Sequence, residues 1–194
     1  MAPLDFPQFT NPALEAFAPL ARGFCELIET RRSRNASAML AEAHRHVVGL
    51  YAAAVNLPDT SVLYDQSRDD DDTPFAEPAI DPDRMTHEEW NALFRDLCEI
   101  AGEFNSYREI FDPYDWDDKA EVVGSLADDL ADIYREIRAG LLKWNRGEPG
   151  AALWEWRFTF EIHWCEHASG ALRAFSALAS REKLPWPGGE AGAA

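Results

Sequence analysis

The clearest structural signal in the chain lies in residues 125–146, which read SLADDLADIYREIRAGLLKWNR. Apolar residues recur there every three or four positions, the spacing that places side chains on one face of an α-helix. They are Leu126, Leu130, Ile133, Ile137, Leu141 and Trp144. Ser125 can cap the first turn, and Arg146 followed by Gly147 is typical of a helix end. The segment therefore predicts a long amphipathic helix.

Three segments that precede it show the same spacing. The first begins near Asn11 and Pro12, and the second follows Asn35. The third begins with Thr86, which has a Glu three residues later and so predicts a capping box. No segment outside the helices gives a convincing strand pattern. The sequence predicts an all-α fold, a helical bundle of about five helices.

The fifth helix follows the quoted stretch and runs from Pro149 to about Ser180. Its start alternates between apolar and polar residues from Trp154 to Trp164, which is a strand signal. Helical spacing nevertheless continues to Leu178 without a turn signal, so helix is preferred. A helix that is apolar on two sides is expected to be central in its bundle. The short link before Pro149 predicts antiparallel packing against the fourth helix.

The remaining segments are predicted to be loops around a single helical domain, residues 1–184. Residues 58–85 contain four consecutive Asp and four Pro, which predicts a long acidic surface loop. Residues 107–118 are rich in aromatic and acidic residues and should fold over one end of the bundle. The tail, residues 185–194, is mostly Pro, Gly and Ala and is expected to be disordered.

The amino-acid composition limits which binding partners and which cellular location are expected. The net charge of −17 disfavours nucleic acid and anionic membrane surfaces, and it makes a basic protein a more natural partner. The three cysteines are odd in number and widely spaced, and no secretory signal or membrane span is evident, so a cytoplasmic location is expected. The many aromatic residues suggest self-association as a homodimer.

The first candidate for chemistry lies on the fifth helix. His163 and His167 are four residues apart and share a helical face, which is the spacing for two ligands to one transition metal. Glu161, close to Arg157 on the same helix, would be the third ligand. In the alternative interpretation both histidines are hydrogen-bonded core residues, and Arg157 pairs with Glu161 in a polar core cluster.

The second candidate is an acidic set on the fourth helix, consisting of Asp128, Asp129, Asp132 and Glu136. Bundles that bind magnesium or manganese direct carboxylates inward in this way. On a helical wheel, however, Asp128 and Asp132 lie nearly opposite the apolar stripe, which favours a solvated face. A partner subunit could still cover that face.

No complete catalytic motif accompanies these residues, because no phosphate-binding loop and no nucleophile elbow is present. The favoured hypothesis is therefore a non-enzymatic acidic interaction module. The alternative is a metal-dependent hydrolase that uses zinc, manganese or magnesium on a phosphorylated or other small substrate. No cofactor beyond such a divalent metal is suggested.

Two long segments resemble the signatures of an uncharacterised bacterial family, domain of unknown function 5063. They are residues 122–136, VVGSLADDLADIYRE, and residues 152–167, ALWEWRFTFEIHWCEH. Residues 111–113, FDP, resemble a third, shorter signature, and the likeness spans roughly residues 15–178. The resemblance implies no activity. It does imply that the Asp-rich start of the fourth helix and the His-bearing fifth helix are family features.

Overall fold

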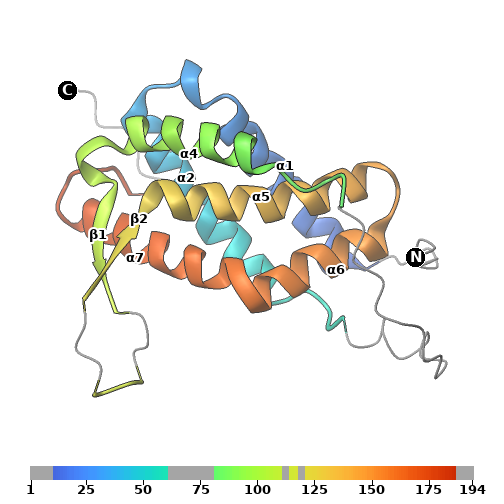
Figure 1. The fold of residues 1–194 in the computed structure, drawn as a ribbon. Coiled ribbons are helices and arrows are strands. Elements are labelled where there is room, and N and C mark those ends of the chain that lie inside the picture. The colour runs from blue at the N-terminus through green and yellow to red at the C-terminus, as the bar shows by residue number, and fades with distance from the viewer. Residues whose placement is uncertain (1–10, 61–80, 111–113, 118–120, 187–194) are drawn as a thin grey trace.

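The computed structural model describes residues 11–60, 81–110, 114–117 and 121–186, and in these ranges the fold is mostly α-helical, as predicted. The helices are α1 (Pro12–Glu29), α2 (Ala36–Ala54), α4 (His87–Ala101), α5 (Leu126–Asn145), α6 (Pro149–Thr159) and α7 (Cys165–Ser180). Shorter helical turns are η1 (Arg31–Ser33), η2 (Gly102–Phe104) and the π-helical turn η3 (Phe160–Trp164). Strands β1 (Ser106–Glu109) and β2 (Val122–Ser125) complete the elements (Figure 1).

The predicted helix starts are confirmed by their caps. The side chains of Asn11, Asn35 and Ser125 each accept a hydrogen bond from a backbone N–H in the first turn of the helix that follows. Thr86 and Glu89 form both halves of the capping box. These local hydrogen bonds satisfy N–H groups that have no partner inside the helix, which is why the sequence signals them so clearly.

The central helix is α5, whereas the sequence analysis expected the segment after Pro149 to be central. Helix α5 contacts α1, α4, α6 and α7, and Figure 1 shows it crossing the middle of the bundle. Small residues explain the difference, because they allow neighbouring helices to approach α5 closely. A Cβ on Gly140 would collide with the indole of Trp156, for example. The Trp156 Nε1–H instead donates to the carbonyl of Ile137 at 3.0 Å.

The segment from Pro149 to Ser180 is one helical run, which confirms the choice of helix over strand. Of the alternating apolar residues, Trp156, Phe160 and Trp164 are buried, because residues four apart share one helical face, whereas Ile162 between them is exposed. Helices α6 and α7 pack antiparallel to α5, as the short link predicted (Figure 1).

A small β-hairpin corrects the expectation of no strands and of a loop over residues 107–118. Strands β1 and β2 pair antiparallel, with Ser106 opposite Ser125 and Glu109 opposite Val122. Four residues per strand are too few for a recognisable alternating pattern. Residues 111–113 and 118–120 of the predicted loop lie outside the described residues.

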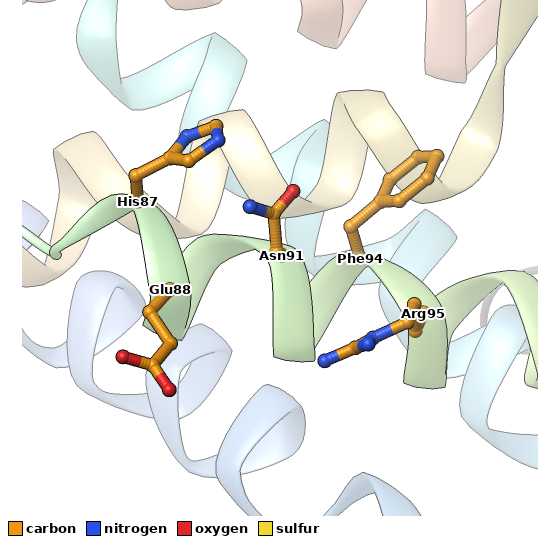
Figure 2. A pocket seen from close by; sticks show the side chains of 5 residues that line it. All are labelled: His87, Glu88, Asn91, Phe94 and Arg95. Atoms are coloured by element: carbon orange, nitrogen blue, oxygen red, sulfur yellow. The ribbon is translucent and has the colours of Figure 1, made fainter.

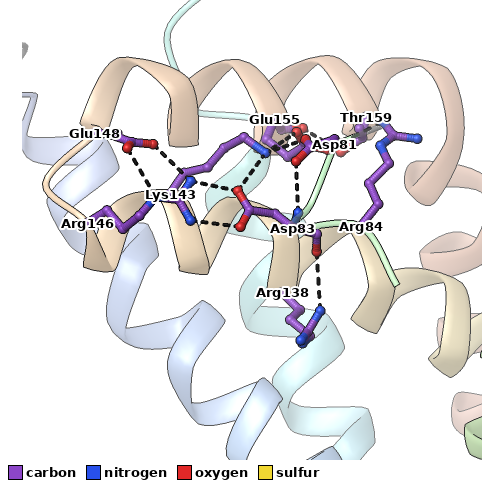
Figure 3. A network of polar contacts seen from close by, with 9 residues as sticks. All are labelled: Asp81, Asp83, Arg84, Arg138, Lys143, Arg146, Glu148, Glu155 and Thr159. Carbon is purple, nitrogen blue, oxygen red and sulfur yellow. Dashed lines mark hydrogen bonds and ion pairs between the residues drawn. The ribbon is translucent and has the colours of Figure 1, made fainter. Parts of the chain in front are cut away.

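A network of charged side chains joins residues 81–84 to the α5–α6 junction (Figure 3). Lys143 lies 2.7 Å from Asp81 and 3.1 Å from the fully buried Glu155, and Arg146 makes two hydrogen bonds to Asp83. This end of the predicted acidic loop 58–85 is thus fixed to the bundle. Residues 61–80, which include the four consecutive Asp, and the tail residues 187–194 lie outside the described residues.

The three cysteines are unpaired thiols, with Cys25 buried and Cys98 and Cys165 half-buried. Burial, reinforced by the charge of Glu29, raises the pKa of Cys25 to about 12, so this thiol is not activated as a nucleophile. No helix in the described ranges combines the length and the hydropathy that crossing a membrane requires.

Candidate metal centre

The two sets of residues that the sequence suggested separately lie together, on facing sides of α5 and the η3–α7 run. Helix α5 contributes Asp128, Asp129 and Asp132, while η3 contributes His163 and α7 contributes His167. We call these five residues the Asp–His cluster. In η3 the N–H of Cys165 donates to the carbonyl of Phe160, five residues earlier. Such π-helical turns are rare in proteins overall, and many of those that occur lie at functional sites.

His167 is the middle of the cluster, because its two ring nitrogens face different carboxylates. Its Nδ1 lies 3.0 Å from Asp129 Oδ1 and 3.9 Å from Asp128 Oδ2. Its Nε2 lies 3.5 Å from Asp132 Oδ2. The ring of His163 is next to it, with 4.9 Å between the ring centroids. His167 therefore links the carboxylates of Asp128 and Asp129 to that of Asp132, one turn further along α5.

Among the described residues, two sets of three side chains bring their ligand atoms within 4.8 Å of one another. One consists of Asp132, His163 and His167, and the other of Asp128, Asp129 and His167. Ligand atoms around a metal with bonds near 2 Å are about 3–4 Å apart, so small side-chain shifts would close either set on an ion.

The first set has the partners that usually orient metal ligands. Asp132 Oδ1 accepts a hydrogen bond from Trp90 Nε1 at 3.1 Å, and it lies 3.0 Å from the Arg135 guanidinium. The other oxygen, Oδ2, is the one that faces His167. His163 Nδ1 lies 3.4 Å from Glu136, and Asp129 takes the corresponding place beside His167. A ligating histidine commonly directs its second nitrogen to a carboxylate in this way.

Tyr107 of β1 adds a further contact to the cluster. Its hydroxyl donates to Asp129 Oδ2 at 2.7 Å, while Asp129 Oδ1 faces His167. Burial raises the pKa of Tyr107, and the charge of Asp129 raises it further, so the hydroxyl keeps its proton and remains a donor. Asp129 is thus held from the hairpin on one side and contacts α7 on the other.

Negative charge dominates the electrostatics of the site. Burial raises the pKa values of Asp128 and Asp129, and the charge of Asp132 also raises that of Asp128. Burial alone would lower the pKa of His167, but its hydrogen bond to Asp129 and the nearby carboxylates raise it overall. Because the carboxylates raise the pKa of His167 in spite of its burial, this place attracts positive charge.

The solvated face expected for the acidic set is wrong for three of its four carboxylates, and only Asp128 is substantially exposed. Asp129, Asp132 and Glu136 are only 5%, 7% and 4% exposed. A wheel of α5 alone could not show that the η3–α7 run and α4 cover this side of the helix. Glu161 also differs from the expectation of a third ligand. It pairs with Arg157 at 2.6 Å, and its side chain is 45% exposed, so this pair lies at the surface rather than in the core.

The sequence analysis did not identify Tyr107, Trp90 or Arg135. Arg135 lies in the quoted stretch and could have been found as an i+3 partner of Asp132. The other two contacts join residues 22 and 42 positions apart, for which one sequence carries no signal.

An open depression of about 690 Å³ lies on α4, lined by His87, Glu88, Asn91, Phe94 and Arg95. His87, Asn91 and Phe94 extend to one side of the helix (Figure 2). Phe94 stacks on Trp90, with 5.2 Å between the ring centroids, and Trp90 in turn donates a hydrogen bond to Asp132. None of the cluster residues is among the described residues that line it.

Comparison with known proteins supports the fold and the family. The crystal structure of protein BF1032 from Bacteroides fragilis is similar, with a TM-score of 0.65 and 19% sequence identity. The similarity covers 87% of this chain and 92% of that chain. No curated protein matches the sequence. The model of a domain of unknown function, DUF5063, matches residues 9–181, and the chain therefore belongs to the DUF5063 family.

Proposed function

We propose that this protein binds a divalent transition metal through Asp132, His163 and His167. One observation carries the proposal: three side chains of the types that ligate such metals converge within 4.8 Å of one another. The sequence alone favoured an interaction module because no such convergence could be seen in it. Imidazole and carboxylate ligands together suit zinc, iron and manganese better than calcium, which prefers oxygen ligands.

Three protein ligands leave coordination positions for water or a substrate, which is typical of catalytic rather than structural metal sites. A metal ion in such a site lowers the pKa of a bound water and supplies hydroxide at neutral pH. The arrangement thus favours hydrolysis, the alternative that the sequence left open. Asp128 lies at the edge of the cluster, with 41% of its side chain exposed, and is placed to contact an incoming substrate.

The local charge argues against phosphorylated substrates. Four carboxylates, those of Asp128, Asp129, Asp132 and Glu136, lie at this place, and Arg135 contacts two of them. A phosphate group would be repelled there, so we expect a neutral or cationic substrate.

Titration of the metal-free protein with cobalt(II) tests the site, because its visible spectrum reports coordination. We expect one tightly bound ion per chain, with binding lost in Asp132→Asn and His163→Gln. Asp128→Asn is the matched control, since it removes one carboxylate of the same cluster but belongs to the other set of three. Loss of binding in Asp128→Asn alone would transfer the site to that second set.

A second candidate function, an interaction module, is favoured by the exposed apolar side chains of the hairpin region. Tyr114 and Trp116 are 86% and 85% exposed, and Val123 is 76% exposed. Self-association through this region would provide the homodimer suggested by composition. Sedimentation equilibrium tests it: a dimer that Trp116→Ser converts to a monomer supports this function, whereas a monomeric wild-type protein contradicts the homodimer.

A further inference from the structure

We propose that Tyr107 is a positioning residue of the metal centre, acting through Asp129 on His167. The inference rests on the proposed function. The Tyr107 hydroxyl donates to Asp129 Oδ2 at 2.7 Å, and Asp129 Oδ1 lies 3.0 Å from His167 Nδ1. Asp129 is therefore fixed at both oxygens. The orientation that it imposes on the imidazole leaves Nε2, on the side of Asp132, to bind the ion.

Two glycines make room for the phenol ring. A Cβ on Gly124 of β2 would collide with the ring of Tyr107, and one on Gly170 of α7 would collide with its hydroxyl. Neither glycine has a positive φ, so backbone conformation does not require glycine at either position. A glycine inside a helix is less favourable than alanine, so its presence at position 170 needs a reason. Close approach of Tyr107 is the feature that explains both residues.

Further side chains surround the Tyr107 hydroxyl in addition to Asp129. Glu109 Oε2 lies 3.4 Å from the Tyr107 oxygen, and Arg173 of α7 forms an ion pair with Glu109. The single hydroxyl proton has a much shorter contact with Asp129 than with Glu109, so it is donated to Asp129. The ion pair attaches the hairpin to α7 beside the cluster, and it thereby keeps the phenol of Tyr107 next to Asp129.

Tyr107→Phe tests the role, because it removes only the hydroxyl oxygen and leaves the ring between the two glycines. Loss of such an outer partner typically weakens metal binding about 10–100-fold. We expect a loss of about tenfold in cobalt(II) affinity, with a changed visible spectrum of the bound ion and an unchanged fold. Tyr134→Phe is the matched control, since the Tyr134 hydroxyl donates at 3.1 Å to Glu29, away from the cluster.

Gly170→Ala provides a second, independent variant. This substitution keeps the Tyr107 hydroxyl, but the added methyl group pushes the hydroxyl away from Asp129. The same loss of cobalt(II) affinity is therefore expected. The inference is overturned if wild-type protein binds cobalt(II) and Tyr107→Phe matches it in both affinity and spectrum. Failure of the wild-type protein to bind cobalt(II) would instead contradict the proposed function, and this inference with it.

Discussion

At the scale of single residues, Asp132 is a carboxylate that its neighbours orient. Its Oδ1 is contacted by Trp90 from α4 and by Arg135 from its own helix, while Oδ2 faces His167. Two donors on one oxygen fix the plane of the carboxylate and leave the other oxygen for an ion. Orientation of this kind is what distinguishes a binding site from a group of acidic residues on a surface.

Trp90→Phe is predicted to weaken metal binding without unfolding the protein. The substitution removes the indole N–H that holds Asp132 but keeps an aromatic ring stacked on Phe94. We expect a loss in cobalt(II) affinity of about tenfold, measured by competition with a chelator. Trp154→Phe is the control, because Trp154 stacks on Phe158 in the same manner but lies on α6. Equal affinity of wild type and Trp90→Phe would contradict the role given to the indole.

How much of the site could be predicted depended on the range of its contacts. The histidine pair and the acidic set each lie within one helical segment, where the helical repeat reveals shared faces, and both were identified. The convergence of the two sets, and the contribution of Tyr107, depend on how α5, the η3–α7 run and the hairpin pack. No local rule specifies that packing, so the sequence suggested solvent where the structure has a buried cluster.

At the scale of elements, the start of α4 and the α5–α6 junction depend on buried charge pairs. Lys143 is surrounded by Asp81, Asp83 and Glu155, and Glu155 is fully buried (Figure 3). Burial raises the pKa of Glu155, and Lys143 opposes that rise. The network fixes the segment that leads into α4, and α4 in turn carries Trp90.

Lys143→Met is predicted to destabilise the fold by about 3 kcal/mol, because it leaves Glu155 buried without its nearest cation. Urea denaturation monitored by circular dichroism measures the change. The double variant Lys143→Met with Glu155→Gln should recover part of the loss, since the buried negative charge is then gone. Lys183→Met, at an exposed position, is the control. Wild-type stability of Lys143→Met would show that the pair is not essential.

Asp83 is predicted to contribute to unfolding in acid. Its hydrogen bonds to Arg146 lower its pKa, so its stabilising effect is present above the unfolded value near 3.8 and is lost as the pH falls through the lower folded value. Asp83→Asn should cost about 1 kcal/mol at pH 7, given that Arg146 is half exposed.

Melting temperatures from pH 7 to pH 3 test this contribution. The difference between wild type and Asp83→Asn should narrow as the pH falls. Glu103→Gln, at an exposed position of η2, is the control. A difference that is constant over this pH range would exclude titration of Asp83 as its cause.

The elements that could be predicted were those with their own local hydrogen bonds or a long apolar repeat. Asn11, Asn35, Thr86 and Ser125 marked their helix starts because a cap needs only residues within one turn. The hairpin was not predicted, because its two short strands are held by each other and by α7. The central position of α5 was not predicted either, because it depends on how closely the neighbouring helices pack against it.

At the scale of the whole molecule, a net charge of −17 and a buried cluster of carboxylates both favour a bound cation. An ion that binds only the folded state stabilises it, by about 2.7 kcal/mol when its concentration is a hundred times the dissociation constant. For a domain of this size we predict a rise in melting temperature of roughly 5–10 °C with zinc, reversed by a chelator. His167→Ala should show no such rise, and an equal rise in that variant would place the ion elsewhere.

The most direct test is elemental analysis of metal in the wild-type protein and in Asp132→Asn and His167→Ala, purified side by side after growth with added zinc, iron and manganese. The proposed centre predicts about one transition-metal ion per wild-type chain and little in either variant. Wild-type protein without metal, or variants that retain as much as the wild type, would contradict a metal centre built from Asp132, His163 and His167.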